Sequence, residues 1–144
     1  MSEQLSNSAR NQFKGTVTKL TTGMVNTEVI LDIGNGHSIA AVITNASASF
    51  LDLKVGTSAW ALFKASWVIL SSEKGLKTSA RNTFTGKILS LKKGTINGEV
   101  VVDLPGGNSI ASIVTNSSIE RLGLVEGLEV SALVKASHVI LAVK

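Results

Sequence analysis

The sequence of 144 residues contains no cysteine, no tyrosine, one proline and two histidines. The absence of cysteine excludes disulfides, thiolate metal sites, iron–sulfur clusters and thiol nucleophiles. Two histidines, His37 and His138, are too few for a multi-histidine transition-metal centre within one chain. Aromatic residues make up only 4% of the chain. This scarcity argues against the stacking platforms that a single-stranded nucleic-acid groove needs. We expect the aromatic residues Phe13, Trp60, Phe63, Trp67 and Phe84 to be core or interface anchors.

Long apolar runs and a targeting signal are missing as well. The apolar stretches, such as residues 39–43 and 67–70, are far too short to span a bilayer. The first ten residues, MSEQLSNSAR, lack the basic and apolar regions of a signal peptide. We therefore expect a cytoplasmic protein that does not contact a membrane. The net charge of +4 is a mild excess of cations, which favours an anionic partner.

An internal repeat dominates what is present. SARNQFKGTVTKL at residues 8–20 returns as SARNTFTGKILSL at residues 79–91, and KASWVIL at residues 64–70 returns as KASHVIL at residues 135–141. The offset is 71 residues in both cases, and no gap is needed between these segments. A fixed-period repeat of this kind indicates one structural unit written twice.

The repeat predicts the domain organisation. We expect an N-terminal tail (1–7), a first domain (8–70), a polar linker (71–78) and a second domain (79–144). A domain of about 65 residues buries little surface and is marginally stable alone. Packing between copies, within or between chains, is therefore expected.

Short alternating runs between glycine-rich turns predict an all-β fold. In the first copy we expect strands over residues 11–20, 27–33, 37–43 and 58–70. A short helix is expected to begin near Ser47 and, in the second copy, near Ser118. The G-x-x-N segments at residues 23–26 and 94–97 predict tight hairpins. Evenly spaced strands of this length favour two tandem small antiparallel β-barrels, each with one short helix.

Two motifs in each copy supply hydrogen-bond donors and positive charge, and neither motif contains a carboxylate. They combine a cation, a hydroxyl and small residues that we expect to leave backbone N–H groups accessible, a set suited to a tetrahedral oxyanion. The alternative is that these cations are solvated charges at strand ends. The candidate residues are Ser8, Ala9, Arg10, Lys64, Ala65 and Ser66 in the first copy, and Ser79, Ala80, Arg81, Lys135, Ala136 and Ser137 in the second.

A second kind of candidate anion site precedes each short helix, where free backbone N–H groups attract anions. Its residues are Thr44, Asn45 and Ser47, and Thr115, Asn116 and Ser118. The alternative is plain capping, in which Ser47 and Ser118 accept from the helix backbone. Both kinds of motif are retained between the copies while neighbouring positions change, as where Phe50 becomes Arg121.

The carboxylates do not indicate an enzyme. Glu28 and Asp32 share one strand face, as do Glu99 and Asp103, but no nucleophile or glycine-rich phosphate loop accompanies them. An exposed strand face explains these pairs. We therefore expect a binding protein without a cofactor and without a bare metal cation.

The ordered set of motifs resembles the molbindin family in its tandem form, with two Mop-type (TOBE) domains per chain. The matching motifs are S-A-R-N, G-x-[VI]-N-x-E-V-x-x-D, I-x-x-x-[IV]-T-N-x-S and K-A-S-x-V-I-L, each present twice. The resemblance implies OB-like barrels and cytoplasmic binding of molybdate, and often of tungstate, for molybdenum storage and homeostasis. It further implies a homotrimer that holds anions at domain and subunit interfaces.

Molybdate at neutral pH is a tetrahedral dianion without protons, so a site built only of donors suits it. Two other functions remain open. One is an OB-type module that binds single-stranded nucleic acid, against which the few aromatic residues argue. The other is an anion sensor that acts through a separate partner protein.

Overall fold

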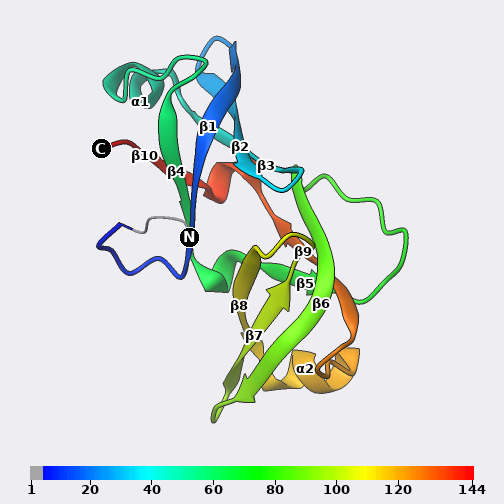
Figure 1. Ribbon diagram of the computed structural model, residues 1–144. Helices are drawn as coiled ribbons and strands as arrows, with labels where there is room; N and C mark the ends of the chain where they lie inside the picture. Colours follow the sequence, from blue (N-terminus) through cyan, green and yellow to red (C-terminus); the bar gives the residue numbers. More distant parts are fainter. Residues whose placement is uncertain (1–4) are drawn as a thin grey trace. The chain divides into compact units, whose positions relative to one another are not determined.

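The structure, a computed structural model, describes residues 5–144, so the first four residues of the expected N-terminal tail lie outside the described residues. The described chain forms two compact units, each with one five-stranded antiparallel sheet and one short α-helix (Figure 1). The prediction of an all-β protein with two tandem small domains of this class is confirmed. In chain order the elements are β1 (Asn11–Thr22), β2 (Asn26–Gly34), β3 (His37–Thr44), α1 (Asn45–Phe50), β4 (Ser58–Phe63), the 3-10 helix η1 (Ala65–Trp67), β5 (Ile69–Ser71), β6 (Asn82–Lys93), β7 (Asn97–Asp103), β8 (Ser109–Thr115), α2 (Asn116–Leu122), β9 (Glu129–Val134), the 3-10 helix η2 (Ala136–His138) and β10 (Ile140–Ala142).

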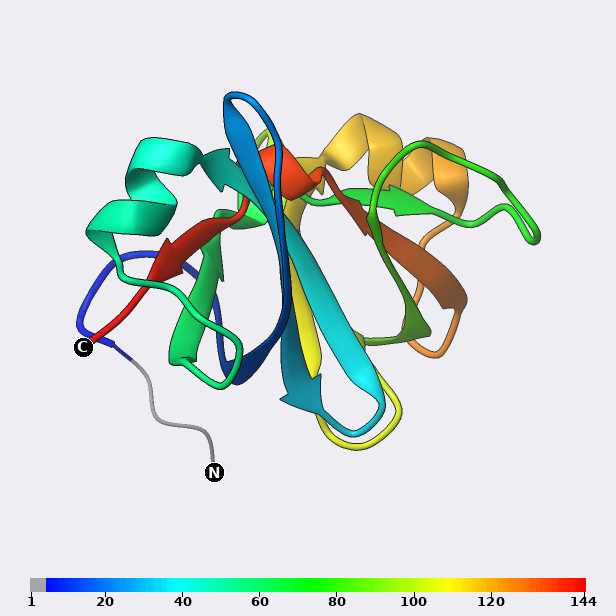
Figure 2. The ribbon, with the colours of Figure 1, turned by 90° about the horizontal axis from the view of Figure 1, so that it is seen from above.

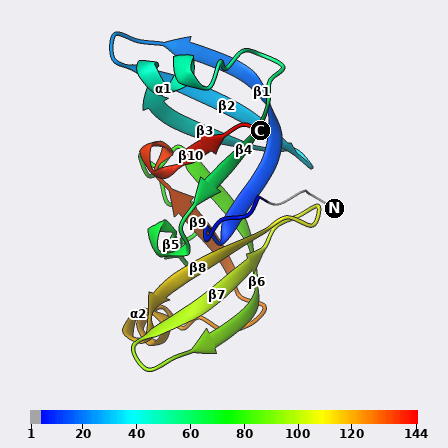
Figure 3. The same cartoon turned by 90° about the vertical axis from the view of Figure 1, so that its left-hand side faces the viewer.

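The compact units divide the chain differently from the sequence repeats. Unit 1 contains Met1–Phe63 together with Lys135–Lys144, and unit 2 contains Lys64–Val134. The reason is that each repeat ends in a strand that pairs in the other repeat's sheet. The strand order is β10-β4-β1-β2-β3 in unit 1 and β5-β9-β6-β7-β8 in unit 2. Figures 2 and 3 show the red β10 beside β4 of the first repeat.

The expectation of one continuous strand over residues 58–70 is wrong. β4 ends at Phe63, a turn of 3-10 helix follows, and β5 begins at Ile69. The turn is closed by hydrogen bonds from Trp67 N to Lys64 O at 3.0 Å and from Val68 N to Ala65 O at 3.3 Å. Residues 58–70 are mostly apolar because β4 and β5 are both partly buried, but in two different sheets. Hydropathy alone does not distinguish one sheet from the other.

Each sheet curves so that its outer strands approach one another, as an OB-like barrel requires. In unit 1, β10 contacts β3, the strand at the opposite end of the sheet order, and in unit 2 β5 contacts β8 in the same way. The barrel interiors are filled by aliphatic and aromatic side chains that alternate along the strands. Fully buried examples are Val17, Val29, Leu31, Ile39 and Phe63 in unit 1, and Val100, Val102, Ile110, Ile119, Val130 and Val134 in unit 2.

One glycine in each long first strand allows a close crossing of backbones. A Cβ atom at Gly86 would collide with the carbonyl oxygen of Asp103, and the corresponding Gly15 faces Asp32 in the same way. We expect Gly86→Ala to lower the free energy of unfolding by about 2–3 kcal/mol, because a backbone carbonyl cannot move aside. Urea denaturation measures this, with Lys87→Ala at the exposed neighbouring position as control. Equal midpoints for the two variants would contradict the close crossing.

Candidate functional site

The motifs that contain Arg or Lys are called the first-type motifs here, and the motifs before the short helices are called the second-type motifs. The two first-type motifs of each repeat lie at the same end of a pair of strands. In the first repeat, β1 and β4 pair with Asn11 opposite Phe63, so Arg10 leads into this end of the ladder and Lys64 leaves it. In the second repeat, Asn82 lies opposite Val134, with Arg81 and Lys135 in the corresponding places. The two motifs of each repeat lie more than fifty residues apart in the sequence. Antiparallel strand pairing brings their backbones to the same end of the ladder.

The side chains of these motifs divide into an exposed and a buried group. The cations and the serines are exposed, whereas Ala65 is only 3% exposed and Ala136 only 6%. The buried alanines fix each 3-10 turn against its unit: η1 packs on β8 and η2 packs on β3. The donors therefore stand on a backbone that the core holds in place.

The expectation of accessible backbone N–H groups is wrong at two alanines. Ala9 N donates to Asn7 Oδ1 at 2.9 Å, and Ala80 N donates to Thr78 Oγ1 at 3.1 Å. Both acceptors are exposed side chains two residues earlier, which form local turns of a kind that Asn and Thr favour. An anion that uses these amides must displace a side chain first.

Trp67 contributes to the site in a way that the sequence analysis missed, since aromatic residues were assigned to the core or to an interface. Lys64 Nζ lies 5.5 Å from the centroid of the Trp67 ring. Lys64 immediately precedes the 3-10 turn that Trp67 ends, and Trp67 N donates to Lys64 O at 3.0 Å. The K-x-x-W spacing was therefore a signal that the two side chains could meet across one turn. The core assignment is confirmed for the other four, since Phe13, Trp60, Phe63 and Phe84 are buried.

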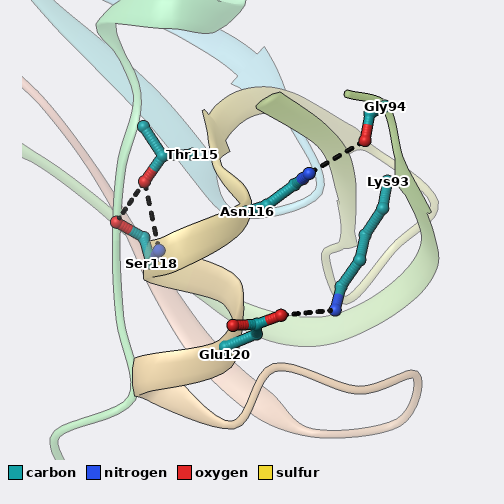
Figure 4. Close-up of polar contacts among 6 residues, drawn as sticks. All are labelled: Lys93, Gly94, Thr115, Asn116, Ser118 and Glu120. Atoms are coloured by element: carbon teal, nitrogen blue, oxygen red, sulfur yellow. Dashed lines mark hydrogen bonds and ion pairs between the residues drawn. The ribbon is translucent and has the colours of Figure 1, made fainter. Parts of the chain in front are cut away.

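At the second-type motifs, threonine rather than serine is the helix cap. Thr44 Oγ1 accepts from Ser47 N at 3.1 Å and donates to Ser47 Oγ at 2.9 Å, and Thr115 and Ser118 repeat both contacts. The expectation that the serines cap the helices is wrong, because each serine is the third residue after the capping threonine and lies within the helix. Figure 4 shows the arrangement in the second repeat. The Ser hydroxyl proton stays available to a ligand, since each hydroxyl carries one donor.

The asparagine after each cap anchors the helix start to the preceding hairpin. Asn45 Nδ2 donates to Gly23 O at 3.0 Å, and Asn116 Nδ2 donates to Gly94 O at 2.8 Å (Figure 4). Gly23 N in turn bonds Asn26 O at 2.8 Å, which is the tight hairpin expected from G-x-x-N. The asparagine is therefore a structural tie within the second-type motif.

The two repeats differ around this asparagine. Thr27 Oγ1 donates to Asn45 Oδ1 at 2.6 Å, but Gly98 takes the place of Thr27 in the second repeat. Among the described residues, Asn116 Oδ1 is buried without a hydrogen-bond partner. Ile119, in place of Ala48, occupies the space where a Gly98 side chain would lie. The second helix also carries an exposed ion pair, in which Lys93 Nζ lies 3.6 Å from Glu120 Oε1 (Figure 4).

Within residues 5–144, no group of three or more His, Asp or Glu side chains could hold a metal ion. None of the helices in this range has the length and hydropathy that a membrane span requires. The site's chemistry is that of cations and hydroxyls.

Comparison with known proteins gives consistent matches. The family model described as the TOBE domain matches residues 7–70 and 78–141. The chain is 44% identical over 142 residues to the molybdenum transport protein ModE of Azotobacter vinelandii, covering 99% of this chain and 53% of that protein. It is 46% identical over 66 residues to molybdenum-pterin-binding protein 1 of Clostridium pasteurianum, covering 46% of this chain and 97% of that protein.

A solved structure matches along the whole length. The crystal structure of the cytoplasmic molybdate-binding protein ModG, in a form with molybdate bound, superposes with a TM-score of 0.93 at 45% sequence identity. The match covers 97% of this chain and all of that one. By contrast, the chain spans about half the length of the ModE protein that it matches.

Proposed function

The chain belongs to the TOBE domain family, and from this membership we propose that it binds molybdate reversibly in the cytoplasm, for storage and homeostasis of molybdenum. The observation that carries the proposal is the likeness to ModG, which extends over both repeats and is named for molybdate binding. A binding role also suits the exposed donors at each ladder end, which supply charge without a nucleophile.

We assign the first-type anion sites to the cation and hydroxyl motifs of both repeats. An Arg fork and a Lys ammonium supply charge-assisted bonds, and a Ser hydroxyl supplies a rotatable donor. An unprotonated dianion accepts from all of these and needs no acceptor in return. The proposed residues are Ser8, Ala9, Arg10, Lys64, Ala65, Ser66, Ser79, Ala80, Arg81, Lys135, Ala136 and Ser137.

The second-type sites are a further part of the proposal. The cap pairs Thr44 with Ser47 and Thr115 with Ser118 each retain one hydroxyl proton for a ligand, whereas Asn45 and Asn116 hold the hairpin beside it. Uncharged donors of this kind bind an anion more weakly than cations do. We therefore expect these sites to fill after the first-type sites.

We propose that the protein assembles as a homotrimer and that tungstate competes with molybdate. Exposed apolar side chains on the outer strands support assembly: Ile140 of β10 is 53% exposed and Ile69 of β5 is 62% exposed. Burying such side chains stabilises small domains that have little core of their own. Tungstate shares the tetrahedral shape and charge of molybdate, so hydrogen-bond donors alone do not separate the two.

Native mass spectrometry tests the function and the assembly together. We expect a trimer that gains several molybdate masses and gains none with sulfate at equal concentration, because sulfate is smaller. Tungstate added to the molybdate complex should displace it. A monomer that gains no molybdate mass would overturn the proposal, and single-stranded nucleic acid would then be the next ligand to test.

A further inference from the structure

Lys64 and Lys135 occupy equivalent positions but have different neighbours three residues later. The backbone before each 3-10 turn is nearly the same, with φ and ψ of −73° and 143° at Lys64 and of −67° and 137° at Lys135. Trp67 ends the turn η1, and His138 ends the turn η2. Because the backbones match, the two turns can be compared directly at the side chain three residues after each lysine.

The Trp67 ring holds the Lys64 ammonium on its turn. The distance of 5.5 Å to the ring centroid lies within the range of a cation–π interaction, for which indole is the strongest side-chain partner. Such contact leaves most of the ammonium N–H groups free for a ligand. It also reduces the rotamer freedom that a flexible lysine loses when it binds an anion.

We propose that Trp67 is a positioning residue for Lys64, so that the two lysine-containing anion sites of one chain differ in affinity. The site with Lys64 binds molybdate more tightly, because its cation is already ordered. The site with Lys135 binds more weakly, because the imidazole of His138 does not offer a comparable ring face. This inference rests on the proposed molybdate function and deepens it, since the chain would fill its sites in a defined order.

Variants that keep only one of the two lysines allow the molybdate affinity of each site to be measured separately. Lys135→Met leaves Lys64 as the lysine of the first-type sites, and Lys64→Met leaves Lys135. In the Lys135→Met background, Trp67→His should weaken molybdate binding by about two- to fivefold, which corresponds to one cation–π contact at an exposed site. In the Lys64→Met background, His138→Trp should tighten binding by a similar factor, a gain that mere structural damage does not produce.

A conservative pair of variants separates ring contact from packing. In the Lys135→Met background, Trp67→Phe keeps an aromatic face and should retain most of the affinity, whereas Trp67→Leu should lose as much as Trp67→His. Isothermal titration with sodium molybdate gives the dissociation constants, and thermal unfolding verifies that each variant is folded.

The outcomes distinguish this inference from the proposed function. Wild-type protein that binds molybdate while all ring variants bind equally would overturn the positioning role and leave the function standing. Wild-type protein that binds no molybdate would overturn both. A gain of affinity in the His138→Trp variant, together with the loss in Trp67→His, would establish the positioning role.

Discussion

Changing Arg10, Lys64, Arg81 and Lys135 together to methionine should reduce molybdate affinity by at least about a hundredfold while the fold remains intact. A hydrogen bond to a charged group contributes about 1.5–3 kcal/mol, and the change removes two cations from each repeat. All four side chains are exposed at the ladder ends, so their loss leaves the barrel interiors unchanged. Isothermal titration with molybdate measures the affinity, and circular dichroism measures the fold.

A matched control distinguishes local charge from net charge. Lys19, Lys54, Lys87 and Lys92 are also exposed, and changing these four to methionine removes the same total charge from other parts of the surface. The control should bind molybdate nearly as tightly as the wild type, because exposed charges beyond about 10 Å are screened at ordinary ionic strength. Unchanged affinity in a folded variant that lacks Arg10, Lys64, Arg81 and Lys135 would refute the site assignment.

Leu70 belongs to the first sequence repeat but lies in unit 2, so Leu70→Ala should destabilise unit 2. Leu70 is 6% exposed and pairs with Ala132 of β9, and its counterpart Leu141 is 7% exposed and pairs with Ala61 of β4. Removing a buried leucine costs about 2–5 kcal/mol, a large share of the stability of a small domain. Hydrogen exchange should therefore show lost protection in β6 and β9 for Leu70→Ala.

The reciprocal variant is the control. Leu141→Ala, near the end of the chain, should reduce protection in β1 and β4 of unit 1 and leave β6 and β9 protected. If each substitution instead weakened the strands of its own repeat, the strand exchange would be wrong. The crossed pattern is hard to produce by general destabilisation, because the two variants remove the same side chain from equivalent positions.

The motif residues could be found from sequence because both repeats retain them. The alternating pattern of residues 27–33 correctly predicted a strand, in which Val29 and Leu31 are buried, and the hairpin at G-x-x-N followed from turn chemistry. The capping residue was misjudged because Thr44 and Ser47 are both good caps, and the choice between them depends on where the helical backbone begins. The helix begins at Asn45, whose side chain donates to the β1–β2 hairpin at Gly23.

The sequence by itself determined the duplication, the all-β class and the chemical kind of the candidate sites, because these depend on composition and local spacing. Only the tertiary structure decided that β5 and β10 exchange sheets and that Thr27 completes the Asn45 network where Gly98 cannot. Alternating hydrophobicity states which face of a strand is buried, not which strand is its neighbour. Partner choice is a long-range property of the folded backbone, and a contact between distant residues appears only once that backbone is assembled.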